Sequence, residues 1–366
     1  MVRYFLFALT IISSSSVAQD TLKISLLFTG DIMQHDSQIS AAFNVDSGRY
    51  DYKPCFQFIK PILSAPDLTI GNLELTLGGP PFKGYPQFSA PDELLDALKD
   101  AGFDVLVTAN NHCVDRGKNG LDRTIDMLDK AQFLHTGTFK DTLDYLNNYP
   151  LIVESKGFRF SLLDYTYGTN GIAVPSPNMV NRIDTVKIRK DLEKAKSQSP
   201  DAIIVFMHWG QEYQSLSNAW QKKVADFCFN HGAKIVIGAH PHVLQPMEWR
   251  KEQDQVIAYS LGNFVSGQRE RYRNGGAMIH IDLEKVIQKD STSNTRMKEV
   301  SYSLASIYRA PNIKRTYYIL PVQQFESDTT FVKGAASLEM IRLFGADSRA
   351  LYKKENKNIN ERTPDY

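Results

Sequence analysis

The sequence contains very little cysteine. Only three of its 366 residues are cysteines, Cys55, Cys113 and Cys228, and they stand far apart. A disulfide scaffold or a zinc knuckle needs more cysteines at closer spacing, so neither is expected. One disulfide with one free thiol stays open, but three small buried side chains are the commoner arrangement.

An excess of charge of either sign is also absent. The formal net charge is +1, and the chain becomes neutral once the segment that carries Arg3 is removed. A neutral chain has no general field that attracts nucleic acid or an anionic membrane surface. With 42% hydrophobic and 23% charged residues, the composition is that of a packed globular protein. Binding of a polyanion must therefore come from a local site.

Long hydrophobic runs are missing as well. The apolar run Tyr4 to Ile12 is well short of the roughly 20 residues that cross a bilayer. It follows Arg3 and precedes small residues that end at Ala18, an order typical of a secretory signal peptide, which we predict over residues 1–18. No cysteine stands at this junction to carry a lipid anchor. We therefore expect secretion across the inner membrane, giving a soluble periplasmic or cell-surface protein.

The sequence does contain alternating strand-like and helical segments, which predict a single layered α/β domain. The predicted strands are Ile24–Thr29, Leu68–Gly71, Val105–Thr108, Ser161–Asp164, Ile203–Met207, Ile235–Ile237 and Val256–Tyr259. Helices are predicted at Pro91–Ala101, closed by Gly102, and at Leu121–Ala131, Val186–Ser197 and Asn218–Asn230.

The apolar pattern weakens after about Lys285, where Ser, Thr, Asn and Lys accumulate. We therefore predict a main domain over residues 19–284 and an extension over residues 285–350 that packs on it. Within the extension, Ser337–Leu343 is predicted to be a short docking helix. Residues 351–366 are polar enough to predict a disordered tail.

Polar side chains follow five of the predicted strands, and in an open α/β sheet ligands bind at these carboxyl ends. The side chains are Asp31, Asn72, Glu74, Asn110, Asn111, His112, His208, His240 and His242. Each alone has an ordinary explanation, such as a turn, a helix cap or a hydrogen-bonded structural histidine. Together they indicate a site, because the chain has only 8 histidines and four of them come directly after strands.

The mixture of carboxylate, amide and imidazole groups indicates a metal site. These ligands suit Zn, Mn or Fe, and the lack of nearby thiolates argues against a structural zinc. A bridging carboxylate could hold two ions about 3.5 to 4 Å apart, the spacing that clamps an in-line displacement at phosphorus. We predict one or two divalent metal ions per chain, Mn, Zn or Fe.

Six motifs in a fixed order carry a resemblance to a known family. They are Phe28-Thr29-Gly30-Asp31-Ile32-Met33, Gly71-Asn72-Leu73-Glu74, Thr108-Ala109-Asn110-Asn111-His112 with Asp115 and Gly117, His208-Trp209-Gly210-Gln211-Glu212-Tyr213, Gly238-Ala239-His240-Pro241-His242-Val243 and Tyr259-Ser260-Leu261-Gly262-Asn263-Phe264. This ordered set resembles the CapA family of capsule and poly-gamma-glutamate synthesis proteins. The resemblance runs from about Leu26 to Phe264, which is most of the mature chain.

The CapA family is similar in fold to the calcineurin-like metallophosphoesterases, so the resemblance implies a four-layer α-β-β-α sandwich. It also implies the metal ligands Asp31, Glu74, Asn111, His208, His240 and His242, with His112 as the catalytic acid.

Two positions depart from the phosphoesterase pattern. Met33 stands where those enzymes usually place a histidine, and the bridging carboxylate is Glu74 in place of an aspartate. The missing imidazole weakens one of the two metal sites, so a single-metal site stays open. His35 could compensate from the next turn, or it could be a solvent-exposed loop histidine.

Further residues are expected around the ligands. Asp115 is predicted to act with His112 by fixing the orientation of an imidazole. His35, Glu212 and Asn263 are further candidates for contacting the metal ligands or binding substrate. Loop and helix-cap roles are equally open for them. The aromatic residues Tyr165, Tyr167 and Trp209 either line a substrate groove or close the edge of the core.

The resemblance implies an exported protein of capsule or poly-gamma-glutamate type polymer biosynthesis. Two hypotheses stay open: a metal-dependent hydrolase or transferase of phosphoester or peptidyl bonds, and a non-catalytic accessory protein that binds a polyanion for export or anchoring. A periplasmic binding protein without chemistry is less favoured because the imidazoles cluster. The expected partners are a cell-envelope polyanion or polymer precursor and membrane-bound polymer synthesis machinery, with no nucleic acid.

Overall fold

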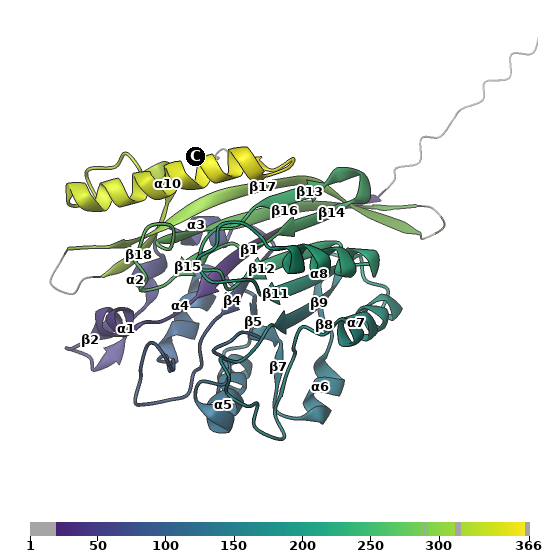
Figure 1. Ribbon diagram of the computed structural model, residues 1–366, viewed down its shortest axis with the longest axis horizontal. Coiled ribbons are helices and arrows are strands. Elements are labelled where there is room, and N and C mark those ends of the chain that lie inside the picture. The colour runs from purple at the N-terminus through teal and green to yellow at the C-terminus, as the bar shows by residue number, and fades with distance from the viewer. Residues whose placement is uncertain (1–19, 289, 291, 312–315, 363–366) are drawn as a thin grey trace, which may run out of the picture.

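The computed structural model describes residues 20–288, 290, 292–311 and 316–362. The predicted signal peptide, residues 1–18, lies outside the described residues. Two large β-sheets form the centre of the molecule, with helices on both sides (Figure 1).

The first sheet has the strand order β18-β17-β16-β1-β4-β5-β6, with β15 beside β1 and β19 beside β17. Its strands are β1 (Asp20–Ile32), β4 (Leu68–Leu73), β5 (Val105–Val107), β6 (Leu134–Thr136), β15 (Asn263–Val265), β16 (Gly275–Ile287), β17 (Ser293–Arg309), β18 (Tyr317–Pro321) and β19 (Asn360–Glu361). Strands β1, β4, β5 and β6 run parallel, so their carboxyl ends share one edge.

The second sheet has the strand order β13-β14-β12-β11-β9-β8. Its strands are β8 (Leu151–Ser155), β9 (Phe158–Thr166), β11 (Ala202–His208), β12 (Ile235–Ala239), β13 (Met247–Arg250) and β14 (Gln255–Ala258). The central four strands, β9, β11, β12 and β14, are parallel. Two short ribbons lie outside the main sheets, formed by β2 (Phe43–Asn44) with β3 (Arg49–Tyr50) and by β7 (Thr138–Phe139) with β10 (Met179–Val180).

Apolar side chains of the two sheets pack against each other to form the main core. Phe28 of β1 and Phe206 of β11 meet there, with ring centroids 5.8 Å apart. The outer face of the first sheet packs on α2 (Lys53–Phe56), α3 (Lys60–Leu63) and α4 (Glu93–Ala101). The outer face of the second sheet packs on α7 (Thr185–Ser197) and α8 (Ala219–Asn230). The result is a four-layer α-β-β-α sandwich, and the expected fold class is confirmed.

The remaining helices lie around these layers. They are α1 (Asp36–Ala42), α5 (Gly117–Lys130), α6 (Thr142–Asn148), α9 (Val322–Phe325), α10 (Ala335–Glu355) and the 3-10 helix η1 (Lys251–Gln253).

The seven predicted strands and four predicted helices are confirmed, with small differences at their ends. Helix α4 ends at Gly102 because that residue adopts a left-handed backbone with a φ of 110°. Helix α8 begins after Asn218, whose side chain accepts a hydrogen bond from the backbone N–H of Gln221. Strand β1 continues to Ile32, where a turn was expected, because Asp31 pairs with Asn263 of β15.

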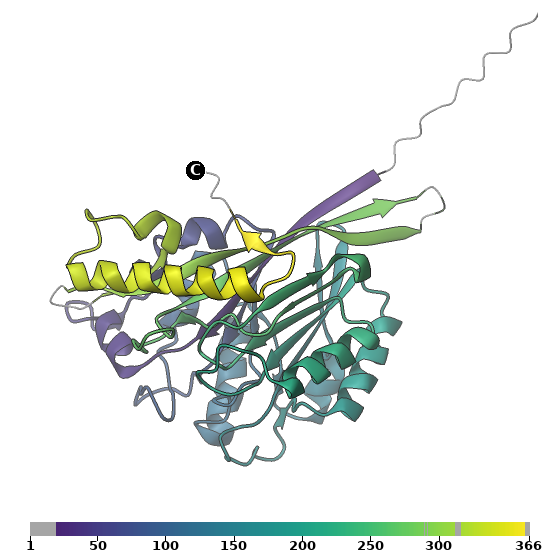
Figure 2. The same cartoon turned by 45° about the horizontal axis from the view of Figure 1, so that its top comes forward.

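The C-terminal part of the chain corrects the predicted domain boundaries. Residue 285 falls inside β16, which pairs along β1, so the predicted extension is an integral part of the first sheet. The predicted helix at Ser337–Leu343 is the N-terminal part of the longer α10, which lies across β17 (Figure 2). The polar composition of this region conceals these elements in the sequence.

The predicted disordered tail is wrong for the part that the structure describes. Helix α10 continues to Glu355, and β19 pairs with β17. Tyr352 and Ile359 are buried in the main core, and these isolated apolar side chains hold the segment in place. Residues 363–366 lie outside the described residues.

The three cysteines are free and buried, which confirms their interpretation as small core side chains. Among the described helices, none combines the length and the apolar character needed to cross a membrane.

Candidate metal centre

The six predicted ligands converge at one end of the sandwich, where strands of both sheets end. Asp31 lies in β1, Glu74 follows β4, Asn111 follows β5, His208 ends β11, and His240 and His242 follow β12. All six side chains are buried. Convergence of this kind is expected because parallel strands bring the residues at their carboxyl ends to one edge.

Two groups of three residues can each hold a metal ion, and they share Glu74. The first group is Glu74, His208 and His240, and the second is Asp31, Glu74 and His242. Within each group the ligand atoms lie within 4.8 Å of one another. The carboxylate of Glu74 therefore stands between the groups, in the position of a bridging ligand.

The individual distances connect the two sheets. His208 Nε2 is 3.5 Å from Glu74 Oε1. His242 Nδ1 is 3.2 Å from Asp31 Oδ2, and His242 Nε2 is 3.8 Å from Glu74 Oε1. Asp31 and Glu74 come from the first sheet, whereas the histidines come from the second.

The buried atoms fit a divalent cation. Neither carboxylate oxygen of Glu74 has a hydrogen-bond partner among the described residues, and the same holds for Nδ1 of His240. A buried carboxylate without partners is costly, and a bound cation would offset that cost. Burial and the neighbouring carboxylate of Asp31 raise the pKa of Glu74 well above its usual value in the absence of a cation.

Two of the ligand histidines are held in the neutral form that metal ligation requires. Burial, together with the neighbouring His242, lowers the pKa of His240 to about 3. Burial and the surrounding imidazoles also lower the pKa of His208 well below its usual value. These neutral rings, carboxylates and an amide suit a borderline divalent ion.

Asn111 adds an amide oxygen to the first group. Its Oδ1 lies 2.7 Å from His208 Nε2, the same nitrogen that faces Glu74. Its Nδ2 donates to Asn170 Oδ1 at 3.2 Å, which fixes the direction of the amide. The predicted ligand therefore lies where a fourth ligand of that group belongs.

Met33 contributes nothing to the second group. Its side chain is buried in the core beneath the helices of the first sheet. The second group nevertheless keeps three ligands without a histidine at this position.

His112 lies beside the ligands and is oriented by Asp115. The Nδ1 atom of His112 is 2.8 Å from Asp115 Oδ2, and both side chains are buried. The same oxygen accepts a hydrogen bond from the backbone N–H of Phe88 at 2.8 Å. The Phe88 ring contacts the imidazole edge-on at 4.6 Å, so the ring is fixed on two sides. With Nδ1 donating to the carboxylate, Nε2 is the nitrogen left for proton transfer.

Two asparagines support the ligands, and one of them, Asn72, was noted at a strand end in the sequence but given no role there. The predicted Asn263 places its Oδ1 3.1 Å from His242 Nδ1. Asn72 donates from Nδ2 to Asp31 Oδ1 at 2.8 Å and lies 3.3 Å from His208 Nδ1. The position of Asn72 at the end of β4 was the signal in the sequence that could have identified it.

Asp164 was missed, although it is the last residue of the predicted strand Ser161–Asp164 and so gave the same signal as the predicted ligands. This buried carboxylate of β9 accepts hydrogen bonds from the backbone N–H groups of Thr108 and Ala109, at 3.0 and 2.7 Å. It thereby connects the second sheet to the segment that leads into Asn111 and His112. Burial raises the pKa of Asp164 well above its usual value.

Neither His35 nor Glu212 is hydrogen-bonded to a ligand among the described residues, and their predicted alternative role in substrate binding stays a prediction. His35 belongs to neither metal group. It precedes α1, and its Nδ1 accepts a hydrogen bond from the backbone N–H of Gly267 at 3.1 Å. Glu212 is exposed, and the ring nitrogens of His208 lie beside Asn72 and Asn111 instead. Sequence proximity to His208 was misleading because the chain passes through the buried Trp209 and then reaches the surface at Gln211 and Glu212.

The three predicted aromatic residues have different roles. Tyr165 and Trp209 are buried and close the core, with hydrogen bonds to Asp191 and to the backbone of Tyr259. Tyr167 is exposed and contacts the ring of His240 at 4.5 Å. Only Tyr167 of the three therefore lies at the metal centre.

Two ligand histidines have a strained backbone. His240 has a φ of 97° and His242 a φ of 58°, in a region that residues with side chains rarely adopt. Such a conformation costs of order 1–3 kcal/mol and is found mainly at functional sites. The strain supports a functional role for this loop.

Comparisons with known proteins place this geometry in a family context. The sequence profile described as "Bacterial capsule synthesis protein PGA_cap" matches residues 25–268, which include both metal groups. The "Capsule biosynthesis protein CapA" of Bacillus anthracis is 30% identical over 275 residues, covering 71% of this chain and 64% of its own length. The "PGA biosynthesis protein CapA" of Bacillus subtilis (strain 168) is 29% identical over 284 residues, covering 72% and 68%. The chain thus spans less than two thirds of the Bacillus anthracis relative.

Two solved structures are distantly similar to this chain. The NAD nucleotidase of Haemophilus influenzae has 12% identity and a TM-score of 0.44, covering 90% of this chain and 61% of its own. The 5'-nucleotidase of Candida albicans SC5314 has 11% identity and a TM-score of 0.44, covering 90% and 57%.

Proposed function

Because the chain belongs to the bacterial capsule synthesis protein family PGA_cap, we propose that it acts in the biosynthesis of a capsule or poly-gamma-glutamate type polymer. Its proposed activity is that of a metal-dependent hydrolase or transferase of phosphoester or peptidyl bonds. The sharing of Glu74 by two buried three-ligand groups is the observation that carries this proposal.

The residues of the centre have distinct proposed roles. Asp31 and His242 would hold one ion, His208, His240 and Asn111 would hold a second, and Glu74 would be shared between them. A divalent ion supplies Lewis acidity, because it polarises a phosphoryl or carbonyl oxygen and activates water.

His112 is the proposed acid. Its Nδ1–H donates to Asp115, so its Nε2 can deliver a proton to the leaving oxygen or nitrogen. The backbone N–H of Phe88 fixes the same carboxylate, so the imidazole keeps one orientation during the proton transfer.

The place of action is part of the proposal. The protein is exported and acts in the periplasm or at the cell surface on a cell-envelope polyanion or polymer precursor, beside membrane-bound synthesis machinery. The signal-like sequence ending at Ala18 and the functions named for the Bacillus relatives support this placement.

Elemental analysis combined with a substrate screen tests the proposal. Purified protein is expected to contain divalent metal and to cleave one class among phosphomonoesters, phosphodiesters and gamma-glutamyl peptides. Asp31→Ala and His242→Ala should lose metal and activity, whereas Asp46→Ala at an exposed position and His231→Ala at the C-cap of helix α8 should keep both. A protein that binds no metal under any condition would contradict the proposal.

A second candidate function is a non-catalytic accessory protein that binds a polyanion for export or anchoring. The buried Met33 favours it, because the second metal group has one imidazole fewer than a full phosphoesterase site. Full polymer affinity and full cellular function in Asp31→Ala and His242→Ala would support this function against the enzyme.

A further inference from the structure

Three tyrosines from three different loops are exposed around the metal centre. Tyr85, Tyr167 and Tyr213 are 67%, 40% and 39% exposed, although large aromatic side chains usually bury most of their area. Tyr85 contacts Phe88 at 6.4 Å, and Phe88 contacts His112. We call these three residues the rim tyrosines.

Two rim tyrosines and two ligand histidines form a row of neighbouring rings. Tyr167 is 4.5 Å from His240, and His240 is 6.0 Å from His242. His242 is in turn 6.1 Å from Tyr213. Tyr167 and Tyr213 therefore stand at the two ends of a row that crosses the metal centre.

Tyr213 is held in this place at an energetic cost. Its φ of 67° is unusual for a bulky side chain. Its backbone N–H donates to the carbonyl of Pro241 at 2.8 Å, between the two ligand histidines. An exposed aromatic side chain on a strained backbone indicates that the ring itself has a function.

An arginine lies on the outer side of Tyr213. The guanidinium carbon of Arg273 is 3.4 Å from the centre of the Tyr213 ring, in a stacked arrangement. The Arg273 carbonyl accepts a hydrogen bond from Asn263, the residue that also contacts His242. Its contact with the exposed Glu270 is long, at 3.6 Å, so that ion pair is weak.

A second arginine lies at the other end of the row. Arg182 is exposed, and its Nη2 donates to the backbone carbonyl of Tyr167 at 3.4 Å. Each end of the row therefore combines an aromatic ring with a guanidinium group. The two arginines add positive charge on both sides of the metal centre, where an anionic chain can pair with it.

We infer that Arg182 and Arg273, with the rim tyrosines, bind a linear carboxylate-bearing polymer that runs across the metal centre. Each guanidinium pairs with a carboxylate on one side of the reacting bond. The tyrosine rings pack against the apolar part of the polymer backbone. The inference rests on the proposed function, and it places an internal bond of the chain, not its terminus, at the metals.

Polymer binding tests the inference directly. The probe is a gamma-linked glutamate octamer, titrated by calorimetry into metal-loaded His112→Ala protein, which lacks the proposed acid and leaves the probe intact. Arg182→Gln and Arg273→Gln should each weaken binding about tenfold, and Tyr213→Ala should weaken it too. Arg296→Gln is the matched control. This exposed arginine lies on β17, away from the metal centre, and the substitution removes the same charge.

The probe length and charge provide two further arms. A glutamate dimer should bind at least tenfold more weakly than the octamer, because it cannot reach both arginines. The methyl-esterified octamer and neutral dextran should bind weakly and without dependence on the arginines.

The outcomes separate the inference from the proposed function. The inference would be overturned if the His112→Ala protein bound the octamer with the same affinity with and without the two arginine substitutions. It would also be overturned if Arg296→Gln lost as much affinity as they do. Equal affinity for dextran would overturn it as well. If the arginines control binding but metal-loaded protein with an intact His112 turns over no substrate, the inference stands and the catalytic proposal fails.

Discussion

Glu74 is the residue on which the candidate site depends most. Its carboxylate belongs to both metal groups, and neither of its oxygens has a hydrogen-bond partner in the described part of the chain. A buried carboxylate in this state stabilises the protein only when a cation neutralises it. For metal binding, the presence of the shared Glu74 carboxylate therefore matters more than the absence of an imidazole at position 33.

At the same scale, Asp115→Asn tests how His112 is held. The amide keeps the size of the side chain but loses the charge that receives the imidazole N–H. Activity should fall about 10- to 100-fold, the usual effect of losing an orienting carboxylate, while metal content stays unchanged. The measurement is kcat together with elemental analysis. A parallel loss of metal would indicate a structural role instead, and unchanged kcat would remove Asp115 from the mechanism.

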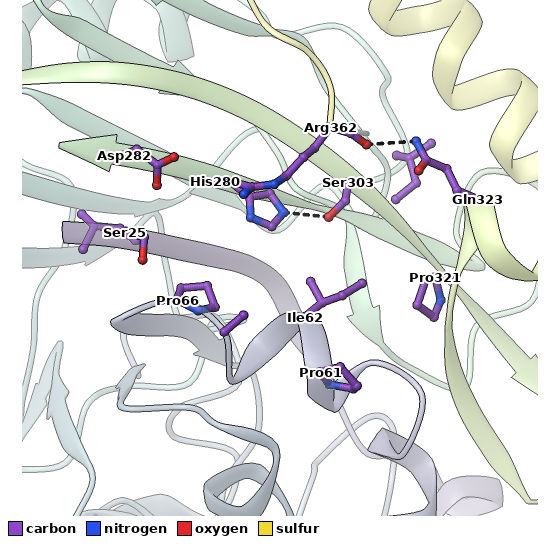
Figure 3. A pocket seen from close by; sticks show the side chains of 13 residues that line it. Ser25, Pro61, Ile62, Pro66, His280, Asp282, Ser303, Pro321, Gln323 and Arg362 are labelled. Atoms are coloured by element: carbon purple, nitrogen blue, oxygen red, sulfur yellow. Dashed lines mark hydrogen bonds between the residues drawn. The ribbon is translucent and has the colours of Figure 1, made fainter. Parts of the chain in front are cut away.

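His280 predicts an effect of pH on stability, away from the metal centre. This buried histidine lines a cavity of about 290 Å³ on the first sheet and bonds Ser303 at 2.8 Å (Figure 3). Burial and the nearby Arg362 lower its pKa to about 3, from 6.5 when unfolded. As pH falls below 6.5, this histidine becomes protonated in the unfolded chain but stays neutral in the folded protein. The free energy of unfolding therefore decreases until about pH 3.

The corresponding variant is His280→Gln. Between pH 7 and 5, the free energy of unfolding of the wild type should fall by about 2 kcal/mol more than that of the variant. Denaturant titrations of chelator-treated protein at both pH values measure this difference. Identical pH dependence of the two proteins would rule out the buried neutral imidazole as its cause.

Single residues also mark the limit of sequence reasoning. Asp31, Asn111 and the histidines could be found because they stand directly after apolar runs. Asp164 also ends a predicted strand, but its partners are backbone N–H groups of the other sheet, which leave no trace in composition or spacing. Arg182 and Arg273 belong to loops whose course over the metal centre depends on the whole fold.

At the scale of elements, the contact between β1 and the segment before β15 places Asp31. A Cβ atom on Gly30 would lie 1.9 Å from the carbonyl oxygen of Gly262. Asp31 donates its backbone N–H to that same oxygen at 2.9 Å. The absence of a side chain at Gly30 therefore lets two segments approach closely enough to bring Asp31 to the histidines.

Gly30→Ala should consequently reduce both stability and metal binding. The clash with backbone is expected to lower the free energy of unfolding by about 1–3 kcal/mol and to weaken metal affinity. Gly48→Ala is a control for backbone strain alone, since Gly48 has a φ of 66° with open space around it. Thermal unfolding and metal titration of both variants measure the effects. Equal losses in the two variants would show that close packing at Gly30 is unimportant.

Elements near the C-terminus were the least predictable part of the fold. The parallel strands of the centre are short and apolar, and the sequence predicts them well. Strands β16 and β17 alternate apolar and polar residues, and α10 is only modestly apolar along its length. The position of such elements is determined by the surface against which they pack, and a single sequence does not specify that surface.

At the scale of the whole molecule, the metal centre joins the two sheets. The first sheet supplies Asp31 and Glu74, and the second supplies the three histidines. A bound ion therefore stabilises the folded sandwich, by about 2.7 kcal/mol when its free concentration is 100 times the dissociation constant.

Removal of metal should lower the unfolding temperature of the whole protein. Chelator-treated protein is expected to unfold at a lower temperature by scanning calorimetry, and added Mn or Zn should restore the loss. Asp31→Ala should show no such response, whereas Asp46→Ala should respond like the wild type. An unfolding temperature that is insensitive to both chelator and metal would contradict a metal bridge between the sheets.

The position of β1 has a consequence for the order in which the chain matures. This strand lies in the middle of the first sheet, between β4 and β16. Phe28 pairs with Ile70 on one side and with Ile279 on the other. The second edge of β1 therefore stays unpaired until β16 has been synthesised. Pairing across such a long stretch is slow and comes last. The first sheet therefore cannot close around β1 until β16 has been synthesised.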